Sequence, residues 1–148
     1  IDATKTGDIT ATAKVWEYRG IHRSISTVSL DPETGLIFVG DFSGFVHCLD
    51  AETGKVQWTH DMKAHMWGST FVADGKVFVG DEDGDFVVLA ATKEKKVISE
   101  TNVGAALYGT PVVANGAVYI QSNTHLFAFR DPSKQSNLKD EPQKIDLK

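Results

Sequence analysis

The chain places short apolar segments between turn residues at a spacing typical of β-structure. Short segments rich in β-branched and aromatic residues are separated by Gly, Asp, Asn and Ser turns along the chain, four of them within residues 69–101, and no apolar stripe has helical spacing. We predict four antiparallel strands here, at Ser69–Ala73, Lys76–Gly80, Asp85–Ala90 and near Lys96–Thr101. Asp74-Gly75 between two apolar runs predicts a tight hairpin, because glycine accepts a positive φ without a Cβ clash.

The same unit repeats with a period of about 41 residues. Three lysines mark the period, Lys14, Lys55 and Lys96. Glycines precede a β-rich run in each unit, at Gly35, Gly75 and Gly116. A single four-stranded sheet of this kind cannot bury both faces, and β-propellers stack such units around an axis. We therefore predict an all-β propeller segment of three four-stranded antiparallel blades, the last of which reaches 126–129 with no fourth strand after it.

One stretch carries a family resemblance. Residues 48–58, Cys-Leu-Asp-Ala-Glu-Thr-Gly-Lys-Val-Gln-Trp, resemble the Ala-x-Asp-x-x-Thr-Gly-Lys-x-x-Trp motif of pyrroloquinoline-quinone (PQQ) type propeller repeats, with Cys where Ala is usual. The resemblance covers residues 1 to about 130. It implies that Trp58 docks between neighbouring blades as a large apolar side chain. The third copy departs from the motif, since Lys93–Lys96 replaces the Thr-Gly turn and no Trp follows.

The N-terminus resembles the end of a further repeat. Residues 1–7 match Leu49–Gly54 with one insertion, and Trp16 then takes the docking place of Trp58. We expect residues 1–13 to end a preceding repeat, and a fourth strand at about Ala13–Tyr18 to belong to that blade. Residues 14–130 then form the three-blade segment, and 131–148 form a polar, flexible tail.

Three blades are too few to close a ring, because propellers usually have about 4 to 8. The resemblance implies a larger propeller, of about eight blades, in which an N-terminal outer strand completes the last blade and removes the sheet edges. Association of several copies is the alternative. The expected partner is therefore another protein chain or the remainder of the propeller.

Composition excludes several classes of function. Fifteen basic and 20 acidic residues give a net charge of −5, and no Lys/Arg cluster favours nucleic acid. The longest apolar stretches have strand length, far short of a transmembrane helix. Cys48 is the single cysteine, so no intrachain disulfide can form. The sequence shows no signal peptide, and a periplasmic or otherwise exported location is what the resemblance implies.

Candidate binding residues lie in the connections between blades. In a propeller, the connections from fourth to first strands and from second to third strands share one face around the channel. These connections differ in character between the repeats, which is where function is expected. The candidates for this funnel are His22, Arg23, His65, Trp67 and Tyr108. Packing at the start of a first strand is the alternative for the two aromatic residues.

Two segments contain weaker candidates for metal ligands. Residues 60–66 hold two imidazoles and two thioethers, including His60 and His65, a composition suited to copper, but their spacing is not diagnostic. Asp81, Asp83 and Asp85 suggest a calcium loop but lack the bidentate Glu of an EF-hand. The counterpart turn at 41–45 forms without those charges. We expect an incidental loop and an exposed acidic hairpin, with no resident metal.

The resemblance allows two functions. Quinoproteins of this kind bind PQQ with calcium, and many contain adjacent cysteines, which are absent here; the calcium ligands match no run of this chain. Hydrolase and metalloprotease motifs are also absent. We expect a non-catalytic scaffolding module that binds proteins and needs no cofactor. The alternative is the C-terminal part of a PQQ- and calcium-dependent dehydrogenase whose catalytic residues lie outside this chain.

Overall fold

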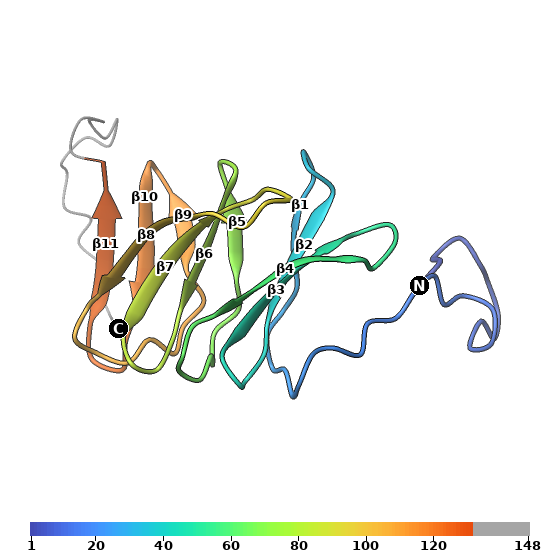
Figure 1. Ribbon diagram of the computed structural model, residues 1–148, viewed down its shortest axis with the longest axis horizontal. Helices are drawn as coiled ribbons and strands as arrows, with labels where there is room; N and C mark the ends of the chain where they lie inside the picture. Colours follow the sequence, from blue (N-terminus) through green and yellow to red (C-terminus); the bar gives the residue numbers. More distant parts are fainter. Residues whose placement is uncertain (132–148) are drawn as a thin grey trace, which may run out of the picture.

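The computed structural model describes residues 1–131, which form eleven strands and no helix. The strands build three antiparallel sheets that lie side by side (Figure 1). The first blade contains β1 (Ser29–Asp31), β2 (Leu36–Gly40), β3 (Phe45–Asp50) and β4 (Val56–Asp61). The second contains β5 (Phe71–Ala73), β6 (Lys76–Gly80), β7 (Asp85–Ala90) and β8 (Val97–Asn102). The third contains β9 (Val112–Ala114), β10 (Ala117–Gln121) and β11 (Leu126–Arg130).

This architecture confirms the predicted all-β propeller segment, with differences at the strand ends. β6 and β7 have the predicted bounds, and β8 begins one residue later than expected. β5 begins at Phe71, not Ser69, because Ser69 and Thr70 bond to neighbouring blades: Ser69 N donates to Thr110 Oγ1 at 2.9 Å, and Thr70 O accepts from Ser29 Oγ at 2.6 Å. Within the described residues the third blade has three strands, β9 to β11, as expected for a last blade with no fourth strand after 126–129.

The strand predicted at Ala13–Tyr18 is not formed in the described structure. Residues 1–28 contain no strand, and in Figure 1 the blue N-terminal segment lies beyond the first sheet. A strand needs a neighbour for its N–H and C=O groups, and none of the eleven strands is paired with this segment. The predicted tail lies outside the described residues, apart from Asp131. Residues 1–131 also contain no helix long and apolar enough to cross a membrane.

Hairpins within the blades adopt the predicted tight turns. Asp74 and Gly75 have φ of 52° and 64° between the paired residues Ala73 and Lys76. The equivalent turn of the third blade has φ of 52° at Asn115 and 73° at Gly116. Positive φ at both central residues defines the type I′ turn, whose twist matches that of the flanking strands.

Apolar side chains pack between neighbouring blades. One cluster lies between the first and second blades and joins Phe38, Val46 and Trp58 to Val77 and Leu89, among others. A second cluster lies between the second and third blades and contains Phe78, Phe86, Val88, Leu107 and Ile120. Successive side chains of a strand point to opposite faces, so the second blade, which lies in the middle, contributes to both clusters. Stacking of the sheets therefore creates the core.

Candidate functional site

The segments that enter the three blades lie beside the turns between second and third strands. Phe42 N donates to Arg23 O at 2.7 Å, and Glu82 N donates to His65 O at 3.0 Å. Leu107 N donates to Asp81 O at 2.9 Å. Each of these hydrogen bonds joins an inter-blade connection to a β2–β3 or β6–β7 turn. The structure therefore places the connections that carry the candidate residues beside one another.

Glycine allows these segments to approach closely. Gly44, in the β2–β3 turn, has φ of 96°, and a Cβ added there would lie 2.3 Å from Ala64 O. Gly84 occupies the same place in the second blade. It has φ of 89°, and a Cβ added there would lie 2.9 Å from Ala105 O. Any other residue would strain both the turn and the connection that crosses it.

Five side chains form a continuous row across the three blades, which we call the aromatic row: Arg23, Phe42, His65, Trp67 and Tyr108. Phe42 stacks on His65, with ring centroids 4.5 Å apart and an interplanar angle of 15°. Trp67 meets Phe42 edge-on at 4.9 Å and Tyr108 at 5.8 Å. Arg23 Cζ lies 5.2 Å from the centroid of the Phe42 ring, within the range of a cation–π contact.

Hydrogen bonds hold the row in place while leaving it accessible. Trp67 Nε1 donates to Glu82 Oε2 at 2.8 Å. His65 Nδ1 lies 2.8 Å from Phe42 O; a carbonyl only accepts, so Nδ1 carries the proton and Nε2 of the neutral ring is an acceptor. Trp67 is 41% exposed and Tyr108 38% exposed. Neither aromatic side chain is therefore committed to the core.

Four of the five predicted funnel residues belong to this row. His22 reaches the same region through its backbone, because His22 N donates to Asp41 Oδ2 at 3.3 Å, while its side chain is exposed. Sequence reasoning missed Phe42 and Glu82, which occupy the same position of the β2–β3 and β6–β7 turns. An aromatic residue in an otherwise polar turn is the signal that could have identified Phe42.

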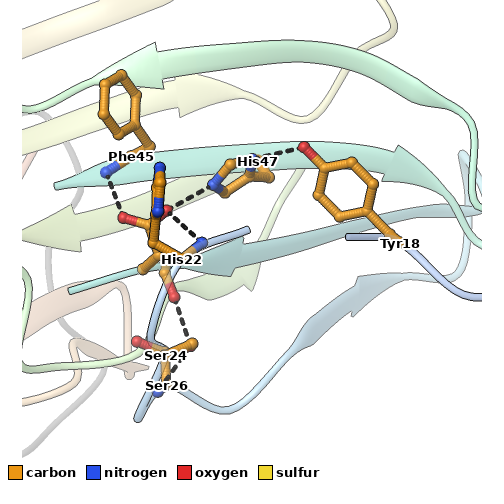
Figure 2. A network of polar contacts seen from close by, with 8 residues as sticks. Tyr18, His22, Ser24, Ser26, Phe45 and His47 are labelled. Atoms are coloured by element: carbon orange, nitrogen blue, oxygen red, sulfur yellow. Dashed lines mark hydrogen bonds and ion pairs between the residues drawn. The ribbon is translucent and has the colours of Figure 1, made fainter. Parts of the chain in front are cut away.

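A polar network centred on two buried side chains, Asp41 and His47, lies in the first blade (Figure 2). His47 Nε2 lies 3.0 Å from Asp41 Oδ2, and Tyr18 Oη lies 3.1 Å from His47 Nδ1. Asp41 is fully buried, which raises its pKa, but the hydrogen bonds from His47, Phe45 N and His22 N outweigh burial. The pKa of Asp41 is therefore below its ordinary value. Tyr18 brings the N-terminal segment into the network, which links it to the first blade.

Asp81 is the counterpart of Asp41 in the second blade, in a different environment. Its Oδ1 accepts from Asp83 N at 3.1 Å and from Asp85 N at 2.9 Å. Among residues 1–131 its buried Oδ2 has no hydrogen-bond partner, because Val87 stands where His47 does in the first blade. Burial raises the pKa of Asp81, and the nearby carboxylates of Asp85 and Asp83 add to the effect.

The weaker metal candidates are not brought together. Within residues 1–131, no group of three or more His, Cys, Asp or Glu side chains is placed to hold a metal ion. Asp85 Oδ1 accepts from Asn102 Nδ2 at 2.8 Å, and Asp81 caps its own turn. His60 lies on β4, where burial lowers its pKa, away from the row that contains His65. The described residues therefore present no donor set that fits calcium beside PQQ.

Two tryptophans form equivalent contacts with the following blade. Trp58 is 7% exposed, and its Nε1 donates to Thr92 O at 2.8 Å. Trp16 Nε1 donates to Ala51 O at 2.9 Å, and its ring lies against Gly54, where an added Cβ would be 2.6 Å away. Both indoles thus donate to a backbone carbonyl in the turn that follows a third strand.

Comparisons with known proteins agree with this arrangement. The family model described as outer membrane protein assembly factor BamB matches residues 8–98 and 43–136. No curated protein matches the chain. The crystal structure of BamB from Moraxella catarrhalis is similar, with 21% identity and a TM-score of 0.61 over 76% of this chain and 34% of that one.

A second similar structure is an enzyme. The quinohemoprotein alcohol dehydrogenase ADHIIG from Pseudomonas putida HK5 has 23% identity and a TM-score of 0.61 over 71% of this chain and 18% of that one. The chain thus spans about a third of the BamB structure and less than a fifth of the dehydrogenase. At these identities the two structures show the fold, and the family model covers most of the sequence. The chain belongs to the PQQ-type propeller repeat family whose model is described as outer membrane protein assembly factor BamB.

Proposed function

We propose that this chain is a non-catalytic segment of a propeller that binds other proteins through the aromatic row. The observation that carries the proposal is the exposure of Trp67 and Tyr108 in a row that crosses all three blades. Aromatic residues and Arg are enriched at protein interfaces, since they contribute a large contact area with little loss of conformational entropy. A solvent-exposed row of this composition suits the surface of a polypeptide.

The row is also preorganised for binding. The indole of Trp67 is fixed by Glu82, and the imidazole of His65 is fixed by the Phe42 carbonyl and ring. Side chains ordered before binding lose less entropy when a partner arrives. We propose that Trp16 and Trp58 contribute indirectly, as docking side chains that fix the stacking of the blades beneath the row.

The family supports a protein partner and an exported location. Its description names an outer-membrane assembly factor, a role that is exercised on other proteins outside the cytoplasm. We infer a scaffolding role in the periplasm, with no cofactor. The structural likeness to a quinohemoprotein dehydrogenase favours a second candidate, part of a PQQ- and calcium-dependent enzyme. That candidate requires catalytic residues outside this chain.

Site-specific photocrosslinking tests the first proposal. A photoreactive amino acid replaces Tyr108 in one variant and Ile98 in the control; Ile98 is 47% exposed on β8, which contributes nothing to the row. We expect a discrete adduct with one polypeptide from position 108 only, and its loss when Trp67→Ala is added. Equal crosslinking at both positions would contradict the proposal.

A dye-coupled oxidation assay separates the second candidate. The protein is reconstituted with PQQ and calcium and supplied with alcohols or sugars. Turnover would support the dehydrogenase, whereas we expect none. The adduct and the oxidation are independent measurements, so each can fail without the other.

A further inference from the structure

A pocket of about 620 Å³ lies between the second and third blades. This volume is in the range of sites that bind small molecules or single side chains, about 300–1,000 Å³. Its apolar walls come from both blades, and charged residues of both signs surround them, including Asp74 and Asp131. The lining residues that matter here are Lys76, Phe78, Val113, Val118, Phe129 and Arg130.

Strand register identifies the counterpart of this pocket in the first pair of blades. Val77 pairs with Val72 and Leu89, as Val118 pairs with Val113 and Phe129. By the same comparison, Phe78 of the second blade corresponds to Phe38 of the first. Phe38 pairs with Cys48 on β3, and Phe78 pairs with Val88 on β7. Cys48 in turn pairs with Trp58, and Val88 pairs with Ser99. Ser99 therefore occupies the position of Trp58.

Trp58 fills the corresponding space between the first and second blades. Its ring lies 5.7 Å from that of Phe38, and it belongs to one apolar cluster with Val77 and Leu89 of the next blade. Its Nε1 reaches Thr92 O. Between the second and third blades, Phe78 and the counterparts of Val77 and Leu89 line the pocket instead. The pocket is thus the seat that an indole occupies one blade earlier.

We propose that this pocket binds a tryptophan side chain supplied by a polypeptide partner. Between the first and second blades, strand β4 supplies the indole that fills the equivalent space. The corresponding strand of the second blade, β8, is exposed along its length and has Ser99 at that position. Phe78 and Phe129 offer aromatic walls. The lining contains two cationic residues, Lys76 and Arg130, and two carboxylates, Asp74 and Asp131. Because the charges of the two signs balance, the lining favours an uncharged ring over an ionic ligand. This site is separate from the aromatic row and does not depend on its function.

A peptide copied from the chain itself provides the probe. The hexapeptide Val-Gln-Trp-Thr-His-Asp reproduces β4, and its counterpart with Ala for Trp is the matched control. Titrated into the full 148-residue chain and followed by NMR, the Trp peptide should shift the amide signals of Val113 and Val118 in a saturable way, and the Ala peptide should not. N-acetyl-tryptophanamide should bind at least about tenfold more weakly than the Trp peptide. Equal affinity would identify the occupant as a small aromatic molecule and overturn the polypeptide proposal.

Two variants test the seat directly. Ser99→Trp should fill the pocket from within the chain, add a blue-shifted indole emission to that of the three native tryptophans and weaken peptide binding at least about tenfold. Val113→Trp fills the same pocket from the opposite wall and serves if the first variant does not fold. Unchanged peptide affinity in a folded variant, or signal shifts that map away from Val113 and Val118, would overturn the proposal.

Discussion

Two of the buried aspartates, Asp41 and Asp81, provide the sharpest test of how hydrogen bonds offset the burial of a charge. They occupy equivalent turns, and both are fully buried. Asp41 Oδ2 accepts a hydrogen bond from His22 N and faces His47 Nε2, whereas Asp81 Oδ2 has no partner in the part of the chain that the structure describes. We predict that the same substitution, Asp to Asn, has opposite effects on stability at the two positions.

At Asp41 the substitution should destabilise the protein. Asn keeps one acceptor oxygen for Phe45 N but sets an amide donor against His22 N, which then has no acceptor. A buried donor left unsatisfied costs about 1–3 kcal/mol. The anion that accepts from His47 is lost as well.

At Asp81 the substitution should stabilise the protein at pH 7. Asn retains the oxygen that accepts from Asp83 N and Asp85 N. It replaces an unpartnered carboxylate oxygen, and removing a buried charge relieves its desolvation. The new amide N–H₂ is also unpaired, so the expected gain is only about 1 kcal/mol.

Urea unfolding between pH 7 and pH 3 measures both effects. The pKa of Asp81 is raised on folding, so the native carboxyl takes up its proton at a higher pH than the unfolded one. The loss of stability that the buried Asp81 carboxylate causes in the wild type therefore falls as the pH drops through the folded pKa. The stability advantage of Asp81→Asn over the wild type should shrink over the same pH range. The pKa of Asp41 is lowered, so its contribution is present above the unfolded pKa and is lost as the pH falls through the folded pKa. If Asp81→Asn destabilised as much as Asp41→Asn, the Oδ2 of Asp81 would hold a partner and the argument would be refuted.

Two further predictions follow from the packing. Gly44→Ala should destabilise more than Gly75→Ala, because both have positive φ but only the Cβ at position 44 would clash with a backbone oxygen, that of Ala64; thermal unfolding compares the two, and equal losses would show that the connection yields. Burial raises the pKa of the Cys48 thiol to about 12, so the native protein should react with a thiol reagent at pH 8 far more slowly than the urea-unfolded chain; similar rates would place Cys48 at the surface.

The strands could be predicted because their determinants are local. Lys76–Gly80 and Asp85–Ala90 are bounded by Gly and Asp turns whose φ preferences act within a few residues. The segment around Trp16 shows where this reasoning fails. Its pattern matches that of β4, but a strand also needs a neighbouring strand, and the described chain supplies none beside it.

Sequence alone determined the repeat, the blade architecture and the end of the propeller at which candidate residues gather, because these depend on spacing along the chain. Only the tertiary structure decided which side chains meet. Arg23 and Tyr108 are far apart in sequence, and they join one row because Phe42 and Trp67 bridge the stacked blades. The sequence also shows that the third copy of the motif lacks tryptophan. Whether that absence leaves a pocket depends on how the side chains of two blades fill the space between them, which no local pattern encodes.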